Sequence, residues 1–388
     1  MSNDEITNKP ESLDVLLDLS RIGAEIRRGP GGKQAIVPYT RLDKPEPEKD
    51  KKTIDKKCDF CPTNWKLSEV YFSGELAQLM LDRGLFVKDN KFPTVLRTSD
   101  VDTRYIEPLG IFHDRKLAKG RHLVMIETPD HNLDPFLPSS EIANYYQNLV
   151  WGYIQMLREL RREGFGTYEW GAVIKNRNGV GKDGNVINAG ASQPHPHSQA
   201  IALEKMPNWL EEYLLPSSSY EKGITTDSLG MVLGGCTGCL EVRDSTGVRG
   251  VFRDVTIETN GIYTSSVARI PEPNPFHVQI KIVPINHQSL FDEMTEQEAY
   301  HFADILHKTM VAVGFRYTNC GFNFELVQGP WKSRHRDNRL YHWECNIYPA
   351  WPELKTIRYD GVMSHLLRMA IPNIPPEHIA REINQNKR

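Results

Sequence analysis

The stretch SQPHPHSQ, from Ser192 to Gln199, holds the residues of this chain that are best suited to covalent chemistry. His195, His197 and Gln199 follow one another at steps of two, and in an extended strand such steps point to one face. Imidazole is a good nucleophile near neutral pH. We therefore predict that His197 attacks a phosphoryl group and that Gln199 donates a hydrogen bond to the charged oxygen.

Two cysteines and two histidines form a set of zinc-type ligands around this stretch. Cys58 and Cys61 have the CxxC spacing, His131 ends the segment TPDH, and His195 lies two residues before the predicted nucleophile. Thiolates and imidazoles in this number are the usual ligands of tetrahedral zinc. Because a closed shell of four ligands leaves no position for activated water, the zinc is predicted to be structural. The alternative for His131 is a residue at a helix entry with no ligand role.

A second CxxC pair, Cys236 and Cys239, raises the question of a second metal. In a reducing compartment this spacing favours metal over a disulfide. His342 is the best distant partner for the pair, and His287 is a weaker one. With only two good ligands visible, the binding of a second zinc stays open at this point.

Composition narrows the class of protein. The chain has 388 residues, enough for two domains or one duplicated domain, and a net charge of −3 argues against a nucleic-acid binder with a basic surface. No apolar run approaches the about 20 residues that span a bilayer, and no signal peptide is readable, so a soluble cytoplasmic protein is expected. Cys320 and Cys345 lie in apolar or aromatic stretches and are predicted to be buried without a ligand role.

The elements that must position these residues occur twice along the chain. In the first copy, the alternating strand 121–128 leads through Pro-Asp-His to a helix predicted over 141–163, whose apolar residues recur at steps of three and four. In the second copy, the strand 276–283 leads through Pro-Ile-Asn-His to a helix that a capping box, Thr295 to Glu298, opens. This repeat predicts an α+β fold with a duplicated unit, antiparallel sheets and packed helices.

The second copy is predicted to have lost the chemistry. The segment from His342 to Pro349 falls where His195 to Gln199 fell, and we interpret Glu344 and Asn346 as the replacements of the two histidines. An asparagine cannot serve as an imidazole-type nucleophile. Catalysis is therefore expected in an N-terminal half, 21–215, while a C-terminal half, 230–385, supplies structure.

The order of these motifs resembles the galactose-1-phosphate uridylyltransferase branch of the histidine-triad superfamily. CxxC, a histidine after Pro-Asp, and Ser-x-x-His-Pro-His-x-Gln occur in that order, and the resemblance runs from about Arg21 to the final helix. It implies two histidine-triad-like halves, a zinc at the first ligand set and a nucleotidyl-histidine at His197. The second CxxC pair and the C-terminal tail are similar to the phosphorylase-like members.

The resemblance also implies a set of substrate contacts. Ser192 matches the family serine that binds phosphate, and Asn178, with Asn176 as the alternative, matches the asparagine on the phosphate side. Asn90 and Phe92 lie in the segment where relatives bind the nucleoside; an ordinary asparagine-led turn is the alternative there.

Three functions follow as hypotheses. The first is a hexose-1-phosphate uridylyltransferase acting on UDP-sugars by ping-pong chemistry, in galactose and carbohydrate metabolism. The second is an ADP-sugar or dinucleoside-polyphosphate phosphorylase that uses inorganic phosphate. The third is a catalytically silent, zinc-stabilised nucleotide-binding protein. The expected partners are a nucleotide sugar with a sugar-1-phosphate or phosphate, without nucleic acid or membrane, and dimeric relatives imply a homodimer.

Overall fold

The computed structural model describes residues 24–28, 34–38, 58–97, 114–181, 184–221, 236, 238–239, 242, 255–268, 278–316, 320–332, 340–351 and 374–385. The chain divides into two compact units, which are treated separately below. One consists of Met1–Pro45 with Asn90–His122, and the other of Glu46–Asp89 with Leu123–Arg388.

The smaller unit contains a three-stranded antiparallel sheet of order β2-β1-β4. The strands are β1 (Ala24–Arg28), β2 (Gln34–Pro38) and β4 (Asp114–Leu117). Ile26 in the central strand pairs with Ile36 on one side and with Lys116 on the other. This register fixes the three strands relative to one another.

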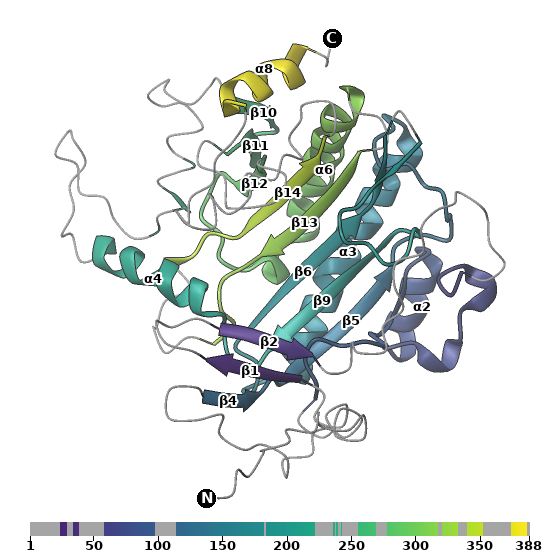
Figure 1. Cartoon of the computed structure of the whole chain (residues 1–388), viewed down its shortest axis with the longest axis vertical. Helices are drawn as coiled ribbons and strands as arrows, with labels where there is room; N and C mark the ends of the chain where they lie inside the picture. Colours follow the sequence, from purple (N-terminus) through teal and green to yellow (C-terminus); the bar gives the residue numbers. More distant parts are fainter. Residues whose placement is uncertain are drawn as a thin grey trace, which may run out of the picture. The chain divides into compact units, whose positions relative to one another are not determined.

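The larger unit is built on a sheet of nine strands. In spatial order they are β10 (Thr256–Thr259), β11 (Tyr263–Val267), β12 (Ile280–Pro284), β14 (Glu344–Ala350), β13 (Gly321–Val327), β6 (Trp170–Arg177), β9 (His197–Leu203), β5 (Gly120–Ile126) and β3 (Phe86–Asp89) (Figure 1). The pairings from β10 through β9 are antiparallel, and so is that of β3 with β5. A short hairpin, β7 (Gly179–Val180) with β8 (Val186–Ile187), follows β6.

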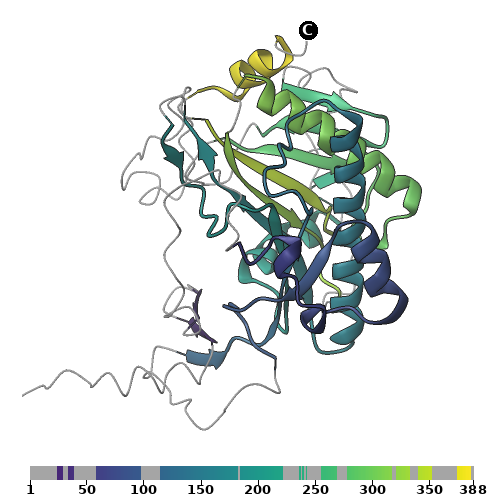
Figure 2. The ribbon, with the colours of Figure 1, turned by 90° about the vertical axis from the view of Figure 1, so that its right-hand side faces the viewer.

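Two long helices, α3 (Ser140–Glu163) and α6 (Glu296–Arg316), cover one face of this sheet and contact each other (Figures 1 and 2). The apolar side of α3 buries Leu157 and Leu160 completely against the sheet. Each such side chain contributes about 1.5–3 kcal/mol to folding. Other helices that the structure describes from end to end are α2 (Gly74–Asp82), α4 (Asn208–Glu221), α8 (Pro376–Gln385) and the short 3-10 turns η3 (Pro62–Asn64), η4 (Leu67–Glu69) and η8 (Phe291–Glu293).

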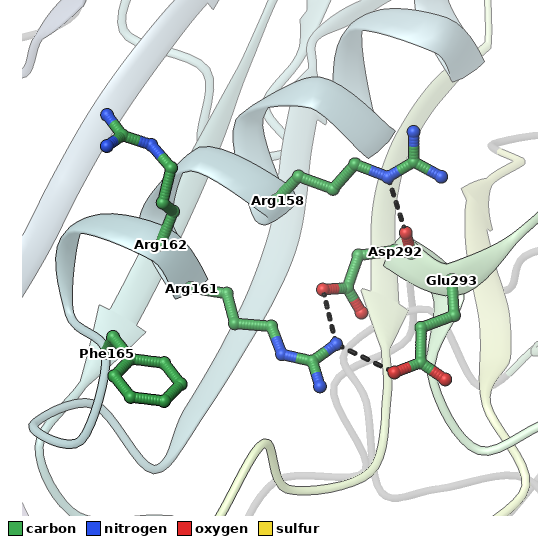
Figure 3. Close-up of a pocket in the computed structure, with 6 residues that line it drawn as sticks. All are labelled: Arg158, Arg161, Arg162, Phe165, Asp292 and Glu293. Atoms are coloured by element: carbon green, nitrogen blue, oxygen red, sulfur yellow. Dashed lines mark hydrogen bonds and ion pairs between the residues drawn. The ribbon is translucent and has the colours of Figure 1, made fainter.

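A pocket of about 380 Å³ lies where the C-terminal end of α3 meets η8 (Figure 3). Arg158 Nε donates to the carbonyl oxygen of Asp292 at 2.7 Å, and Arg161 forms an ion pair with the Asp292 carboxylate at 3.3 Å. Since β6 begins just after α3 and runs antiparallel to β9, this pocket lies at the end of β9 opposite to His197. Its arginines therefore tie α3 to the later part of the chain and do not face the histidine pair.

Local sequence signals predicted these elements closely. The helix expected over 141–163 is α3, where Ser139 caps the N terminus by accepting a hydrogen bond from Ile142 N at 3.3 Å. The capping box is formed: Thr295 Oγ1 accepts from Glu298 N at 3.2 Å, and Glu298 accepts from Thr295 N at 2.8 Å. Cys320 and Cys345 are buried, as predicted.

The fold class, α+β with a large antiparallel sheet and packed helices, is confirmed. The expected halves, 21–215 and 230–385, contribute neighbouring strands to one continuous sheet, because β6 pairs directly with β13. The division into halves stays a prediction, since the two compact units do not follow that boundary. Among the residues that the structure describes, no helix combines the length and the apolar character needed to cross a membrane.

Candidate active site and metal centres

The four residues of the first predicted ligand set come together in space. One ligand atom from each of Cys58, Cys61, His131 and His195 lies within 4.8 Å of all the others. Cys61 Sγ is 3.5 Å from His131 Nδ1 and 3.7 Å from His195 Nδ1, and the two Nδ1 atoms are 3.3 Å apart. Four ligands from three separate parts of the chain thus converge on one point.

These distances fit a tetrahedral metal. With bonds of about 2.3 Å to sulfur and about 2.0 Å to nitrogen, the edges of a zinc tetrahedron are about 3.5 Å from sulfur to nitrogen and about 3.3 Å between nitrogens. The chemistry of the donors agrees. Burial raises the pKa of the Cys58 thiol to about 11, so a thiolate at this position needs a cation beside it. Burial also lowers the pKa of His195, which keeps its ring neutral, as a ligand must be.

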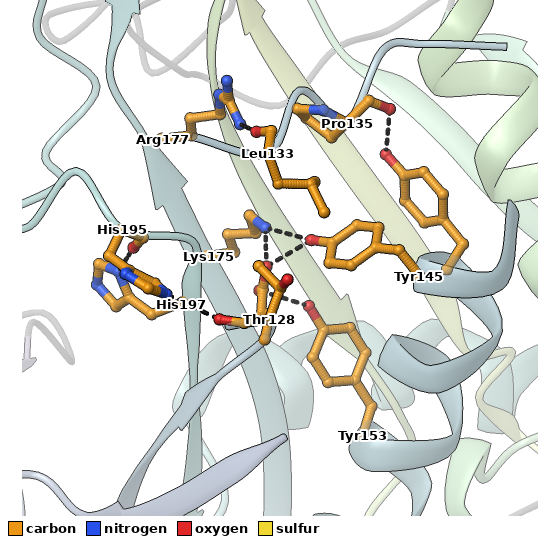
Figure 4. Close-up of polar contacts among 11 residues, drawn as sticks. Thr128, Leu133, Pro135, Tyr145, Tyr153, Lys175, Arg177, His195 and His197 are labelled. Atoms are coloured by element: carbon orange, nitrogen blue, oxygen red, sulfur yellow. Dashed lines mark hydrogen bonds and ion pairs between the residues drawn. The ribbon is translucent and has the colours of Figure 1, made fainter. Parts of the chain in front are cut away.

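The backbone after β5 sets the tautomer of His195. Its Nε2 lies 2.8 Å from the carbonyl oxygen of Thr128, which can only accept, so Nε2 carries the proton (Figure 4). The lone pair on Nδ1 then faces the cluster. A carbonyl behind a ligand histidine is the arrangement that orients such rings in metal sites.

A second cluster of the same composition forms in the later part of the chain. It consists of Cys236, Cys239, His287 and His342, whose ligand atoms again lie within 4.8 Å of one another. Cys239 Sγ is 3.1 Å from His287 Nδ1 and 3.4 Å from His342 Nδ1. A hydrogen bond from the Cys239 thiol lowers the pKa of Cys236 to about 3. Within the described part of the chain, two Cys2His2 groups could therefore hold a metal ion.

His287, the weaker candidate in the sequence, completes this second cluster. Its signal was the repeat itself: His287 stands three residues after Pro284, as His131 stands three residues after Thr128. The structure supports this equivalence with a second pair of matching contacts. His342 Nε2 lies 2.7 Å from the carbonyl oxygen of Pro284, and His195 Nε2 lies 2.8 Å from the carbonyl oxygen of Thr128.

This equivalence corrects the alignment of the two copies. His342 corresponds to the ligand His195, so Glu344 takes the position of His197 and Asn346 that of Gln199. The prediction that Glu344 and Asn346 replace both histidines was therefore wrong, because it shifted the alignment of the two copies by two residues. One histidine of the pair thus has a counterpart, His342, in the second Cys2His2 group, and Glu344 takes the place of the other.

Glu344 and Asn346 instead belong to a network of polar side chains in the later part of the chain. Lys281 forms an ion pair with Glu344 at 2.9 Å, and Asn346 Nδ2 donates to Glu344 at 3.0 Å and to Glu325 at 3.1 Å. Tyr348 donates to Glu325 at 2.7 Å. At the position that corresponds to His197, the later repeat therefore has a carboxylate that is engaged by neighbouring side chains, and no imidazole.

His197 is the first residue of β9, and its ring is held in one orientation. Its Nδ1 lies 2.9 Å from the carbonyl oxygen of His195, so Nδ1 carries the proton and Nε2 keeps the lone pair. The residue is 6% exposed, and its ring packs edge-on against Phe60, with 5.1 Å between ring centroids. The arrangement supplies two things that a nitrogen nucleophile needs, namely a defined tautomer and a fixed direction.

The expected row of three side chains on one strand face is formed only in part. His195 lies before β9 in a bend and points into the metal cluster, since Pro196 has no N–H to give to a strand ladder. His197 and Gln199 alternate with Ala200 and Ala202, which belong to the core under α3, and so share the face of the sheet away from that helix.

Asn178 holds the loop of small residues, 189–192, that precedes the two histidines. Its Oδ1 accepts from Ala189 N at 2.9 Å and from Ala191 N at 3.1 Å, and its Nδ2 donates to the Ala191 carbonyl at 2.9 Å. The amide therefore positions the loop that leads to Ser192, which is partly exposed. Direct phosphate contacts of Asn178 and Ser192 stay predictions.

Asn90 and Phe92 belong to the smaller unit. The Asn90 Oδ1 accepts from Phe92 N at 2.8 Å, which is an asparagine-led turn, and Asn90 Nδ2 lies 3.0 Å from Nε2 of the buried His122. Both side chains are partly exposed. The alternative turn is thus present, and a nucleoside contact stays a prediction.

Solved structures share this fold over most of the chain. A uridylyltransferase structure aligns with a TM-score of 0.64 and 20% identity, covering 93% of this chain and 98% of that one. An ADP-glucose phosphorylase from Arabidopsis thaliana with bound ADP-glucose aligns with a TM-score of 0.59 and 18% identity, covering 91% and 95%. The fold is therefore that of the uridylyltransferases.

One curated relative also matches in sequence. The galactose-1-phosphate uridylyltransferase of Haemophilus influenzae is 28% identical over 162 residues, which are 42% of this chain and 39% of the relative. The match thus spans about two fifths of that relative's length. No protein-family model matches the chain. The chain is a homologue of galactose-1-phosphate uridylyltransferase, and the resemblance read from its motifs is confirmed.

Proposed function

We propose that this protein is a nucleotidyltransferase that acts on nucleoside-diphosphate sugars through a nucleotidyl-histidine at His197. The observation that carries the proposal is the hydrogen bond from His197 Nδ1 to the His195 carbonyl, because it leaves the lone pair on Nε2. The homology to a galactose-1-phosphate uridylyltransferase supports the same chemistry.

The reaction has two displacements at one phosphorus. His197 Nε2 attacks the α-phosphorus of the nucleotide sugar, the phosphorus–oxygen bond to the sugar phosphate breaks, and that oxygen leaves with the electron pair. A phosphate oxygen of the acceptor then attacks the same phosphorus, and the phosphorus–nitrogen bond breaks to restore the imidazole. Gln199, on the same face as His197, would donate to a non-bridging oxygen in both steps.

Zinc is the ion we assign to both Cys2His2 clusters, since two thiolates and two neutral imidazoles suit it. Cys58, Cys61, His131 and His195 would hold the first ion, and Cys236, Cys239, His287 and His342 the second. Zinc with four protein ligands has no open position, so its contribution is to fix the loops it joins. The first cluster would pin His195, and through it the backbone that carries His197.

The acceptor distinguishes two versions of this function. In the first it is a hexose-1-phosphate, as the name of the Haemophilus relative indicates for that enzyme. In the second it is inorganic phosphate, which a phosphorylase would use. The complete second Cys2His2 cluster favours the phosphorylase version, because a second CxxC pair is similar to the phosphorylase-like members.

Labelling of the protein tests the proposal. UDP-glucose and ADP-glucose labelled at the α-phosphate are each incubated with the wild type, and acid-labile label on the protein is measured. Galactose-1-phosphate or inorganic phosphate is then added, and the one that discharges the label is the acceptor. We expect His197→Asn to abolish labelling while its melting temperature stays near that of the wild type.

The matched control is His378→Asn, which removes an exposed histidine of α8 and should label as the wild type does. Nucleotide binding without label from either compound would favour the silent binding protein instead. The residue roles proposed for Ser192, Asn178, Asn90 and Phe92, the homodimer, the absence of nucleic-acid and membrane partners and the cytoplasmic location stay predictions.

A further inference from the structure

A buried charge pair lies directly behind the histidine segment. Glu127, just after β5, and Lys175 of β6 form an ion pair in which the side chains are 0% and 6% exposed. Tyr145 donates to Glu127 Oε2 at 2.5 Å and accepts from Lys175 Nζ at 3.1 Å, and Tyr153 donates to Glu127 Oε1 at 3.4 Å (Figure 4). Both tyrosines come from α3, so the pair joins the helix to the sheet.

The pair stands apart from the chemistry assigned above. Lys175 has the same strand parity as Val173, a core residue, so its side chain lies on the helix-covered face, while His197 and Gln199 lie on the other. Burial lowers the pKa of Lys175, and the charge of Glu127 opposes that shift. Buried ion pairs are weak contributors to stability compared with apolar packing, and fixing one arrangement among several is their best-supported use.

The backbone beside Glu127 holds the catalytic segment at two points. Glu127 N donates to the carbonyl oxygen of Pro196 at 3.2 Å, and the carbonyl of Thr128 accepts from His195 Nε2 at 2.8 Å. The carbonyl of His195 in turn accepts from His197 Nδ1. A shift of Glu127 would therefore move the His195 ring and the Pro196 carbonyl, and with them the backbone that leads into His197.

We propose that Glu127 and Lys175 are positioning residues for His197. Their ion pair, anchored to Tyr145 and Tyr153, fixes the strand end whose backbone holds His195 and Pro196. The carbonyl of His195 in turn fixes the ring of His197 and its Nδ1–H tautomer. The kinetic part of this inference rests on the proposed function, whereas the tautomer part does not.

The test uses Lys175→Met and Glu127→Gln, which keep side-chain size while removing one charge. Single-turnover formation of the nucleotidyl-histidine is followed with saturating α-labelled UDP-glucose and ADP-glucose. We expect the rate to fall by about tenfold or more in both variants while the zinc content stays unchanged. A small misplacement of a nucleophile is enough for such a loss. The KM for the nucleotide sugar should stay unchanged, since both side chains lie on the helix-covered face of the sheet, away from His197.

Two further variants separate positioning from stability. The double variant Glu127→Gln with Lys175→Met carries no unpaired buried charge, so its melting temperature should recover toward the wild type while its rate stays low. Arg161→Met is the matched control: it orphans the buried Asp292 at the other end of α3, and it should lower stability without changing the rate.

A spectroscopic readout works without any substrate. Long-range proton–nitrogen NMR on protein labelled with nitrogen-15 histidine distinguishes the two tautomers of His197, assigned against His197→Asn. We expect one Nδ1–H form in the wild type and a mixture in both single variants. A wild-type tautomer population in these variants, or a wild-type rate at saturation, would overturn the proposal. If the wild type takes no label, the proposed function fails, and the NMR result alone decides the positioning role.

Discussion

At the scale of single residues, the first metal cluster depends on Cys58, a buried thiol from a loop far from the histidines in sequence. Replacement of Cys58 by serine removes a soft ligand that zinc prefers. We expect Cys58→Ser to lose the first zinc and to lower the free energy of unfolding by about 4 kcal/mol or more. Metal analysis and urea denaturation measure both effects.

The matched control for Cys58→Ser is Cys320→Ala, which removes a buried thiol that has no ligand role. That variant should keep its full metal content. Unchanged zinc and an unchanged denaturation midpoint in Cys58→Ser would contradict the structural role of the first cluster.

The second cluster depends on a glycine between its two cysteines. A Cβ added to Gly238 would lie 2.5 Å from the Cβ of His342, closer than real side chains approach. We therefore expect Gly238→Ala to displace His342 and to release the second metal while the first stays bound. Gly74→Ala is the comparison: its φ of 61° strains the backbone, but the added Cβ meets nothing within 4 Å, so both metals should stay bound. Two retained metals in Gly238→Ala would contradict the expected displacement of His342.

At the scale of elements, helix α6 begins with a reciprocal cap between Thr295 and Glu298. Loss of such a cap costs about 1 kcal/mol of stability, because a backbone N–H at the helix start is left without its partner. We expect Thr295→Ala to lower the free energy of unfolding by this amount in urea denaturation. Thr295→Ser keeps the hydroxyl and should stay near the wild type; an equal loss in both variants would argue against the cap.

The strand pair β6 and β13 joins the earlier and later parts of the sheet. Glu325 pairs with Ile174 and Val327 with Ala172, so the ladder carries no irregularity at this junction. Gly171 lets Trp331 approach closely beside it, since an added Cβ would lie 2.2 Å from the indole ring. The two copies are therefore held as one sheet by backbone pairing and by a side chain that requires glycine.

At the scale of the whole molecule, stability should fall on mild acidification. Burial lowers the pKa of His195, so the unfolded chain binds this proton more readily than the folded protein does. The contribution of His195 to the stability of the folded protein is fully present above the pKa of about 6.5 that a histidine has in the unfolded chain. This contribution is lost as the pH falls through the lower pKa of His195 in the folded protein. One such proton changes the free energy of unfolding by at most about 1.4 kcal/mol per pH unit.

Thermal melts between pH 7.5 and 5.5, with metal content followed in parallel, measure this effect. His378→Asn should leave the slope unchanged, because its side chain is 52% exposed. A melting temperature that is constant over this range would contradict the coupling between His195 and folding.

The features that the sequence determined by itself are those that depend on residues close together in the chain. The period of α3 and the capping box of α6 predicted the two helices, and the CxxC spacing predicted the two cysteine pairs that lie in the clusters, because each signal depends on residues a few positions apart. The nucleophilic role of His197 stays a prediction. The repeat also pointed to the second cluster, although it ranked His287 too low.

Only the tertiary structure decided which distant residues meet. It matched His342 with His195, moved His195 out of the strand and into the cluster, and placed Glu127 against Lys175 beneath the histidine segment. No spacing in the chain encodes these contacts, since strand register sets them and a shift of one residue would turn every side chain to the other face.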